Sequence, residues 1–214
     1  MADCDRQQEK PESIASSGSG IRQADPEASA ATEGRTYQTD PERICVLFVG
    51  NRLMMDDGVG PATLDYILQN FDVSDNVDMF DVGCMSMDML DYVRRYDFMM
   101  TVDAVGESGE APGTVFRYKP VDVARNDGPT ASIHDLKLAN LFDAANLMGY
   151  TCEGLCYGMQ VEILEPVEYA IGLTPAVEEK LPFLAESVLA ELWRHGATIS
   201  RKGGEPFGPA FSDF

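Results

Sequence analysis

The stretch that decides the fold is ICVLFVG, residues 44–50, followed directly by NRLMMDDGVGP, residues 51–61. The first part is an unbroken apolar run, which is typical of a central strand covered on both faces of a parallel sheet. The second part is a turn that carries two adjacent acids, Asp56 and Asp57, and it ends at Pro61, which suits the first position of a helix. Strand, acidic turn and helix in this order place the acids at the carboxyl edge of a parallel sheet, where open α/β folds bind their ligands.

The rest of the chain continues this alternation of apolar strands and helices with an apolar stripe. Strands are expected at about 43–49, 77–81, 98–103, 114–118 and 155–163. Helices are expected after Pro61, at about 86–96, at 135–148 and after Pro175, where Thr174 is the expected N-cap. Pro182 is expected to kink the last helix or to delay its start. The βαβαβ series predicts an α/β fold, a three-layer α/β/α sandwich with a mostly parallel, about five-stranded twisted sheet.

Composition divides the chain into three parts. Residues 1–41 are rich in Ser, Gly, Ala, Glu and Gln and contain almost no large apolar side chains, so we expect a disordered segment. Residues 42–200 carry the α/β pattern and form the expected domain. Residues 201–214 are rich in Gly and Pro and are expected to form a flexible tail.

The formal net charge of −20 makes nucleic acid an improbable partner, because phosphate binding needs basic surface. No apolar run approaches the roughly 18 residues of a membrane span, so no membrane contact is expected. The first residues contain no apolar stretch of the kind found in secretory signals. The five cysteines are odd in number and scattered, which is typical of reduced thiols. Together these features predict a cytoplasmic protein.

Three residues with metal-binding chemistry are expected to converge on the acidic edge. Asp57 lies in the turn after the first strand, and it is preferred to Asp56 because it precedes Gly58, where backbone can approach a ligand. Asp56 is expected to bind amides of the turn. Asp103 ends the third strand, which should be the neighbour of the first at the topological switch point. His134 precedes a helix after a loop and can reach the same crevice. Two carboxylates and one imidazole suit Zn, Ni or Mn.

Other readings of the same residues stay open. A Cys84–His134 pair would make a thiol hydrolase, although we expect Cys84 to be a small buried thiol without a catalytic role. Asp81 stands where the ribose-binding acid of a dinucleotide site would lie, but the glycine pattern of that site is missing and two acids oppose a phosphate. His195, at the end of the last helix, is expected to be non-functional.

The chain resembles the hydrogenase maturation proteases over about residues 43–195. Their motif of strand followed by G-N-x-L-x-x-D-[DE]-G-x-G is matched by GNRLMMDDGVG at 50–60. Further matches are VDA at 102–104, APGT at 111–114, SIHDLKL at 132–138 and GLTPAVE at 172–178. The family usually has Asp-Gly-Gly after the second strand, where this chain has DVG at 81–83.

The resemblance implies an endopeptidase, aspartic-type or metal-assisted, that removes the C-terminal extension of a nickel–iron hydrogenase large-subunit precursor after nickel insertion. It implies that Asp57, Asp103 and His134 are both the catalytic and the metal-site residues. The nickel would be supplied by the substrate, although other divalent ions can occupy such a site. Asp81 and Gly83 would contact substrate, because their loop is linked to substrate discrimination in the family. The alternatives are a non-proteolytic nickel-binding chaperone and the thiol hydrolase.

Overall fold

The structure of the protein is a computed structural model. It describes residues 41–84, 90–124 and 133–208, without the side chains of 123–124, 133–137 and 139. The main sheet contains, in spatial order, β3 (Val77–Gly83), β1 (Ile44–Val49), β4 (Phe98–Val105), β6 (Glu153–Gln160) and β5 (Val115–Tyr118). All neighbouring strands are parallel except β5, which pairs antiparallel with β6. The expected α/β class with a mostly parallel five-stranded sheet is confirmed.

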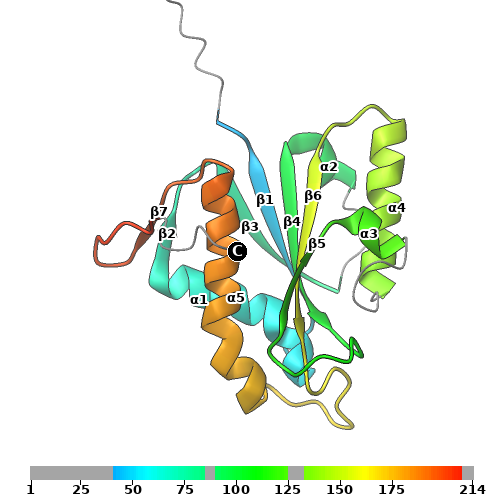
Figure 1. Cartoon of the computed structure of the whole chain (residues 1–214), viewed down its shortest axis with the longest axis vertical. Coiled ribbons are helices and arrows are strands. Elements are labelled where there is room, and N and C mark those ends of the chain that lie inside the picture. The colour runs from blue at the N-terminus through cyan, green and yellow to red at the C-terminus, as the bar shows by residue number, and fades with distance from the viewer. Residues whose placement is uncertain (1–40, 85–89, 125–132, 209–214) are drawn as a thin grey trace, which may run out of the picture. The chain divides into compact units, whose positions relative to one another are not determined.

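Helices cover both faces of this sheet, which Figure 1 shows nearly edge-on. One face carries α1 (Val59–Asn70) and α5 (Pro175–Arg194). The other carries α2 (Leu90–Arg95), α3 (Pro120–Ala124) and α4 (Ile133–Leu147). Because both faces are covered, the central strands have no polar side, and every residue of β1 and β4 is buried. None of the helices within the described ranges is long and apolar enough to cross a membrane.

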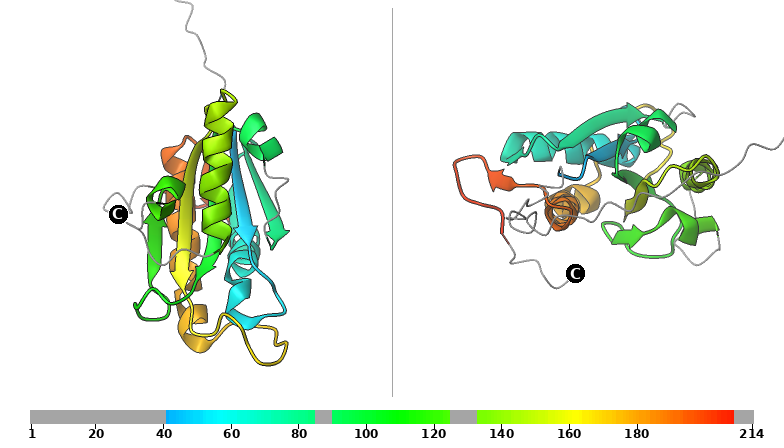
Figure 2. Two further views of the ribbon diagram at one scale, coloured as in Figure 1. Left: turned by 90° about the vertical axis from the view of Figure 1, so that its right-hand side faces the viewer. Right: turned by 90° about the horizontal axis from the view of Figure 1, so that it is seen from above.

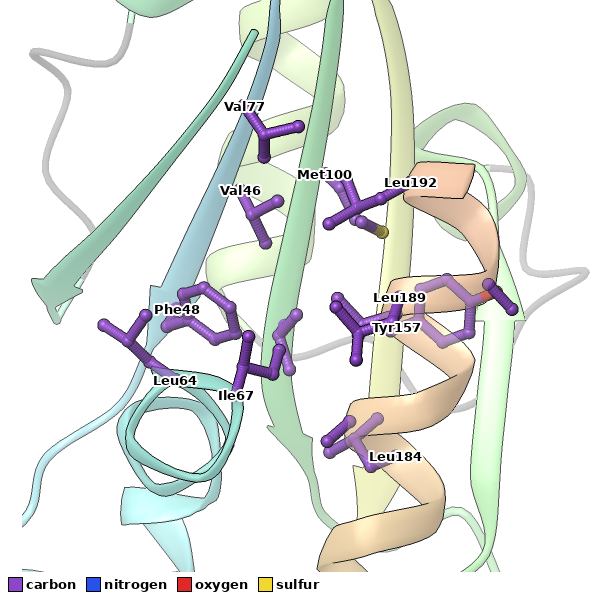
Figure 3. Close-up of a cluster of buried hydrophobic side chains, with 14 of the residues drawn as sticks. Val46, Phe48, Leu64, Ile67, Val77, Met100, Tyr157, Leu184, Leu189 and Leu192 are labelled. Atoms are coloured by element: carbon purple, nitrogen blue, oxygen red, sulfur yellow. The ribbon is translucent and has the colours of Figure 1, made fainter. Parts of the chain in front are cut away.

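The larger of the two hydrophobic clusters that the described residues form lies between the sheet and the pair α1 and α5 (Figure 3). Phe48 from β1, Met100 from β4 and Tyr157 from β6 point towards the helices. Ile67 from α1 and Leu189 from α5 complete the layer, and both are fully buried. Each fully buried side chain of this size contributes about 1.5–3 kcal/mol relative to exposure. This cluster therefore fixes both helices, and with them the loops at the carboxyl edge of the sheet.

One expected helix boundary differs from the structure, and another is confirmed. The first helix begins at Val59, so Pro61 is its third residue rather than its first. The last helix begins at Pro175 and continues through Pro182 to Arg194, so Pro182 does not delay its start. The expected helix start near residue 86 lies outside the described residues, as do residues 1–40 of the expected disordered segment at 1–41.

The C-terminal region contributes more structure than a flexible tail would. A second sheet pairs β2 (Phe71–Val73) with β7 (Ile199–Arg201), and Ser200 and Pro206 form a further bridge. Phe207 is buried, with its ring centroid 5.7 Å from that of Phe71. Residues 201–208 therefore fold back against the domain, because Phe207 gains an apolar contact that a composition of Gly and Pro does not reveal.

Candidate active site

The turn after β1 depends on a glycine with a backbone that other residues rarely adopt. Gly50 has φ +132°, and a Cβ at this position would lie 1.8 Å from the carbonyl oxygen of Asp57. The turn therefore closes tightly, and Asp57 in the short helix η1 (Met55–Gly58) lies against the end of β1. The backbone N–H of Asn51 donates to Oδ2 of Asp57 over 2.8 Å. This bond orients a half-buried carboxylate at the carboxyl edge.

A second glycine brings the acidic turn close to β4. A Cβ on Gly60 would lie 2.1 Å from the carbonyl oxygen of Val49 and 2.7 Å from that of Val102. The start of α1 therefore packs directly on the ends of both β1 and β4, which are parallel neighbours. Val102 precedes Asp103, so the backbone that carries Asp57 and the strand that carries Asp103 meet at the switch point of the sheet.

Asp103 lies inside β4 and is 6% exposed. Its Oδ1 accepts the N–H of Ala104 over 2.8 Å. Met100, Val102 and Ala104 belong to the cluster under α1 and α5, so the alternation of the strand places Asp103 on the opposite face. That face is the one covered by α2 and α4 (Figure 1).

His134 is the second residue of α4. After α4 a short loop leads to β6, which starts at the amino edge of the sheet, so α4 ends towards that edge and starts towards the carboxyl edge, on the face that Asp103 shares (Figure 1). The side chain of His134 lies outside the described residues. Within the described part of the chain, no group of three or more His, Cys, Asp or Glu side chains is placed to hold one ion. The three-residue site of Asp57, Asp103 and His134 therefore stays a prediction.

Asp56 has a role that differs from the expected one. It is fully buried and accepts four hydrogen bonds, none of them from its own turn. The donors are the N–H groups of Glu162 (3.1 Å), Ile163 (3.0 Å) and Thr174 (2.6 Å) and the hydroxyl of Thr174 (2.9 Å). The expected N-cap position is confirmed, since Thr174 precedes α5 and Pro175 is its first residue, but the Thr174 hydroxyl donates to Asp56 and makes no capping bond to the helix. Asp56 thus fastens both ends of the loop between β6 and α5 to the turn that carries Asp57.

Arg52 is a residue that the sequence analysis did not single out. Its guanidinium forms an ion pair with Asp65 on α1 and donates from Nε to Asp81 over 3.0 Å. The signal in the sequence that could have predicted these ion pairs is a single basic residue in a turn with two acids. Asp81 is therefore held by Arg52, while Gly83, at φ +54°, has open space where a Cβ would lie. Their expected contact with substrate stays a prediction.

Cys84 was expected to be a buried thiol, and the structure places it at the surface instead. It follows β3, whose last residue, Gly83, accepts the N–H of Gly50 over 3.0 Å. The four cysteines within the described ranges are free thiols, of which Cys45 and Cys156 are buried. Because the Cys84 thiol is exposed, a thiol-alkylating reagent can reach it, and the thiol hydrolase alternative can be tested directly.

The second histidine lies at the opposite edge of the sheet, in a cluster around one buried carboxylate. Glu191 on α5 is bound by Arg117 and Arg194. Burial raises the pKa of Glu191, but interactions with His195, Arg117 and Arg194 outweigh burial and hold it well below its usual range. The pKa of His195 is raised, first by its interaction with Glu191 and then by that with Glu42, although burial of the imidazole lowers it. The Glu191 carboxylate lies 3.7 Å from Nε2 of His195, and the Glu42 carboxylate lies 3.0 Å from Nδ1.

We expect His195→Gln to destabilise the protein more at pH 6 than at pH 9. Because the pKa of His195 is higher in the folded state, protonation favours folding. That contribution is complete below the unfolded pKa of about 6.5 and is lost as the pH rises through the folded value. Urea unfolding of wild type and variant at both pH values measures the difference, and the wild type cancels the effects of other groups. An equal loss at both pH values would contradict a charged His195.

The chain is similar to known proteins of one family. Residues 62–191 match the family model described as hydrogenase maturation protease. The chain is 33% identical to the hydrogenase 2 maturation protease of Escherichia coli (strain K12), over 72% of this chain and 93% of that protein. It is 29% identical to the hydrogenase expression/formation protein HupD of Rhodobacter capsulatus, over 78% and 81%. The solved structure of the hydrogenase maturating endopeptidase HybD from E. coli superposes with a TM-score of 0.66 at 31% identity, covering 75% of this chain and 98% of that one.

Proposed function

Because this chain belongs to the hydrogenase maturation protease family, we propose that it is an endopeptidase that removes the C-terminal extension of a nickel–iron hydrogenase large-subunit precursor. The observation that carries the proposal is the position of Asp57. Its carboxylate is half-buried, oriented by the Asn51 N–H, and located where β1 and β4 end side by side. The reaction adds water across one peptide bond, so it needs a group that accepts a proton from water.

The donor set fits a nickel ion that arrives with the substrate. Asp57 and Asp103 supply carboxylates and His134 supplies an imidazole, a mixture that suits a borderline divalent metal. Three protein ligands leave coordination positions for groups of the precursor. When bound, nickel would polarise the scissile carbonyl. The residues of this chain then have three tasks: Asp57 and Asp103 attract and orient the incoming centre, His134 completes the donor set, and one of these groups accepts the proton.

The division of labour within the acidic pair supports the proposal. Asp56 uses its carboxylate fully on four internal hydrogen bonds and is inaccessible to solvent. Asp57 accepts the N–H of Asn51 on Oδ2 and lies nearer the surface. Because the bonds of Asp56 make the turn rigid, the turn can hold Asp57 in a fixed position, which favours catalysis by correct orientation.

We expect release of the C-terminal peptide from nickel-loaded precursor and little or no release from precursor without nickel. The physical reason is that three ligands, two of them hard oxygens, bind nickel weakly unless the substrate completes the shell. Mass spectrometry of the large-subunit precursors encoded in the same genome, incubated with the protein, measures the cleavage.

Equal release from both precursors would contradict the nickel-dependent recognition but would keep the protease assignment. Absence of release, together with tight nickel binding by the isolated protein in calorimetry, would favour the chaperone alternative. Release that stops when Cys84 is alkylated would favour the thiol hydrolase. A cytoplasmic site of action is part of the proposal, and the free thiols of the described residues support it.

A further inference from the structure

A group of large apolar side chains is exposed beside the acidic turn. They are Leu53, Val167, Tyr169 and Ile171, which are 50%, 103%, 80% and 83% exposed. We call these four residues the apolar rim. Leu53 belongs to the turn after β1, and the other three belong to the loop that joins β6 to α5. Figure 2 shows this loop and the turn side by side at the lower end of the sheet. Large apolar residues gathered in this way mark interaction surfaces.

Backbone pairing places most of the rim on one face. Met54 and Ala170 form a parallel bridge, in which the N–H of Met55 donates to Ala170 (2.9 Å) and the N–H of Ala170 donates to Leu53 (3.0 Å). Residues on either side of a bridged residue point away from its side chain. Leu53, Tyr169 and Ile171 therefore share the face opposite to Met54 and Ala170, which are only partly exposed.

The rim is also held in a fixed position. Asp56 binds the loop at its beginning, through Glu162 and Ile163, and at its end, through Thr174. The apolar residues lie between these two anchors. A surface that is ordered before binding loses less conformational entropy when a partner docks. Because Asp57 follows Asp56 directly, the rim has a defined position relative to the candidate active site.

We propose that the apolar rim is the docking surface for the folded body of the large-subunit precursor, an inference that rests on the proposed function. A protease that acts on one site of one folded protein needs contacts beyond the scissile bond, and the rim is continuous with the turn that carries Asp57. Glu162, Glu165 and Glu168 are exposed around it, and Glu107, Glu162 and Glu165 line an adjacent hollow of about 420 Å³. The matching surface of the partner is therefore apolar at its centre and basic at its periphery.

The test is the double substitution Tyr169→Ser with Ile171→Ser. The matched control is Leu147→Ser with Met148→Ser, at the far end of α4, where the side chains are 91% and 57% exposed. We expect the rim variant to raise KM for nickel-loaded precursor by at least about tenfold with little change in kcat, since truncation of central aromatic anchors weakens binding by this amount or more. The control should leave KM within about twofold of wild type. Unchanged melting temperatures show that both variants fold.

Calorimetric binding of the same precursor separates this inference from the proposed function. Binding by wild type without cleavage, lost in the rim variant, would keep the docking surface and reject the protease. Normal cleavage by the rim variant with unchanged KM would reject the docking surface and keep the protease. Light scattering measures whether the protein self-associates. If the wild type self-associates and the rim variant is monomeric, the rim is a contact between copies of this chain, and the proposal is overturned.

Discussion

Asp57→Asn is expected to lower kcat/KM for precursor cleavage by about a hundredfold to a thousandfold, the size of effect seen when one preorganised polar group of a catalytic site is removed. The substitution keeps the size of the side chain. Its carbonyl oxygen can still accept the N–H of Asn51, so the turn keeps its shape. The negative charge is lost, and one acceptor oxygen becomes an amide donor. Steady-state kinetics on nickel-loaded precursor, with melting temperature as a check of folding, measure the effect.

Cys84→Ser is the matched control for that experiment, because Cys84 is exposed at the same edge of the sheet. Serine keeps the approximate size of the thiol and removes its nucleophilicity, so cleavage should stay within about twofold of wild type. A loss of cleavage in the serine variant, with Asp57→Asn unaffected, would reverse the ranking of the two residues and make the thiol the reacting group.

The second large effect concerns stability. Asp56→Ala is expected to lower the free energy of unfolding by about 3–5 kcal/mol, since it leaves one buried N–H group, two partly buried N–H groups and one buried hydroxyl without their acceptor. Asp72→Ala is the control, because Asp72 is exposed on β2 and its removal should change stability by less than about 0.5 kcal/mol. Urea unfolding of both variants gives the two free energies.

The outcome for Asp56 also bears on the active site. Its four bonds connect the acidic turn to residues 106 to 118 positions further along the chain. If Asp56→Ala cost no more than Asp72→Ala, water would replace the carboxylate at the four donors, and the loop would not depend on Asp56 for its position. The rigid presentation of the apolar rim would then lose its physical basis.

The two acids show why neighbours in a sequence can differ in function. Asp56 and Asp57 have the same side chain and adjacent positions, yet one is fully buried and the other half-buried. In the short helix η1 successive side chains point in different directions, so one meets the loop between β6 and α5 and the other meets the sheet edge. The preference for Asp57 rested on Gly58, whereas the structure gives the reason through the partners of Asp56.

The sequence by itself determined the architecture. The unbroken apolar run at 44–49 predicts a strand that is buried on both faces, and the segment 98–103 predicts a further strand. The helical stripes between them require crossovers, which leaves a parallel sheet with these two strands as neighbours. The acidic turn follows the end of the first of these strands, and Asp103 stands at the predicted end of the other, which the structure extends to Val105. These features are local, since each depends on a periodicity or a turn within about ten residues, and local patterns can be read without knowledge of distant contacts.

Only the tertiary structure decided which distant groups meet. The four partners of Asp56, the pairing of Arg52 with Asp65 and Asp81, and the contact of Phe207 with Phe71 all join residues far apart in the chain. The bridge between Met54 and Ala170, which gathers the apolar rim, is of the same kind. Spacing along the chain carries no information about such pairs, because each depends on how the sheet and the helices bring separate loops to one edge. A buried acid or an exposed tyrosine therefore acquires its role only from the groups that surround it in the folded protein.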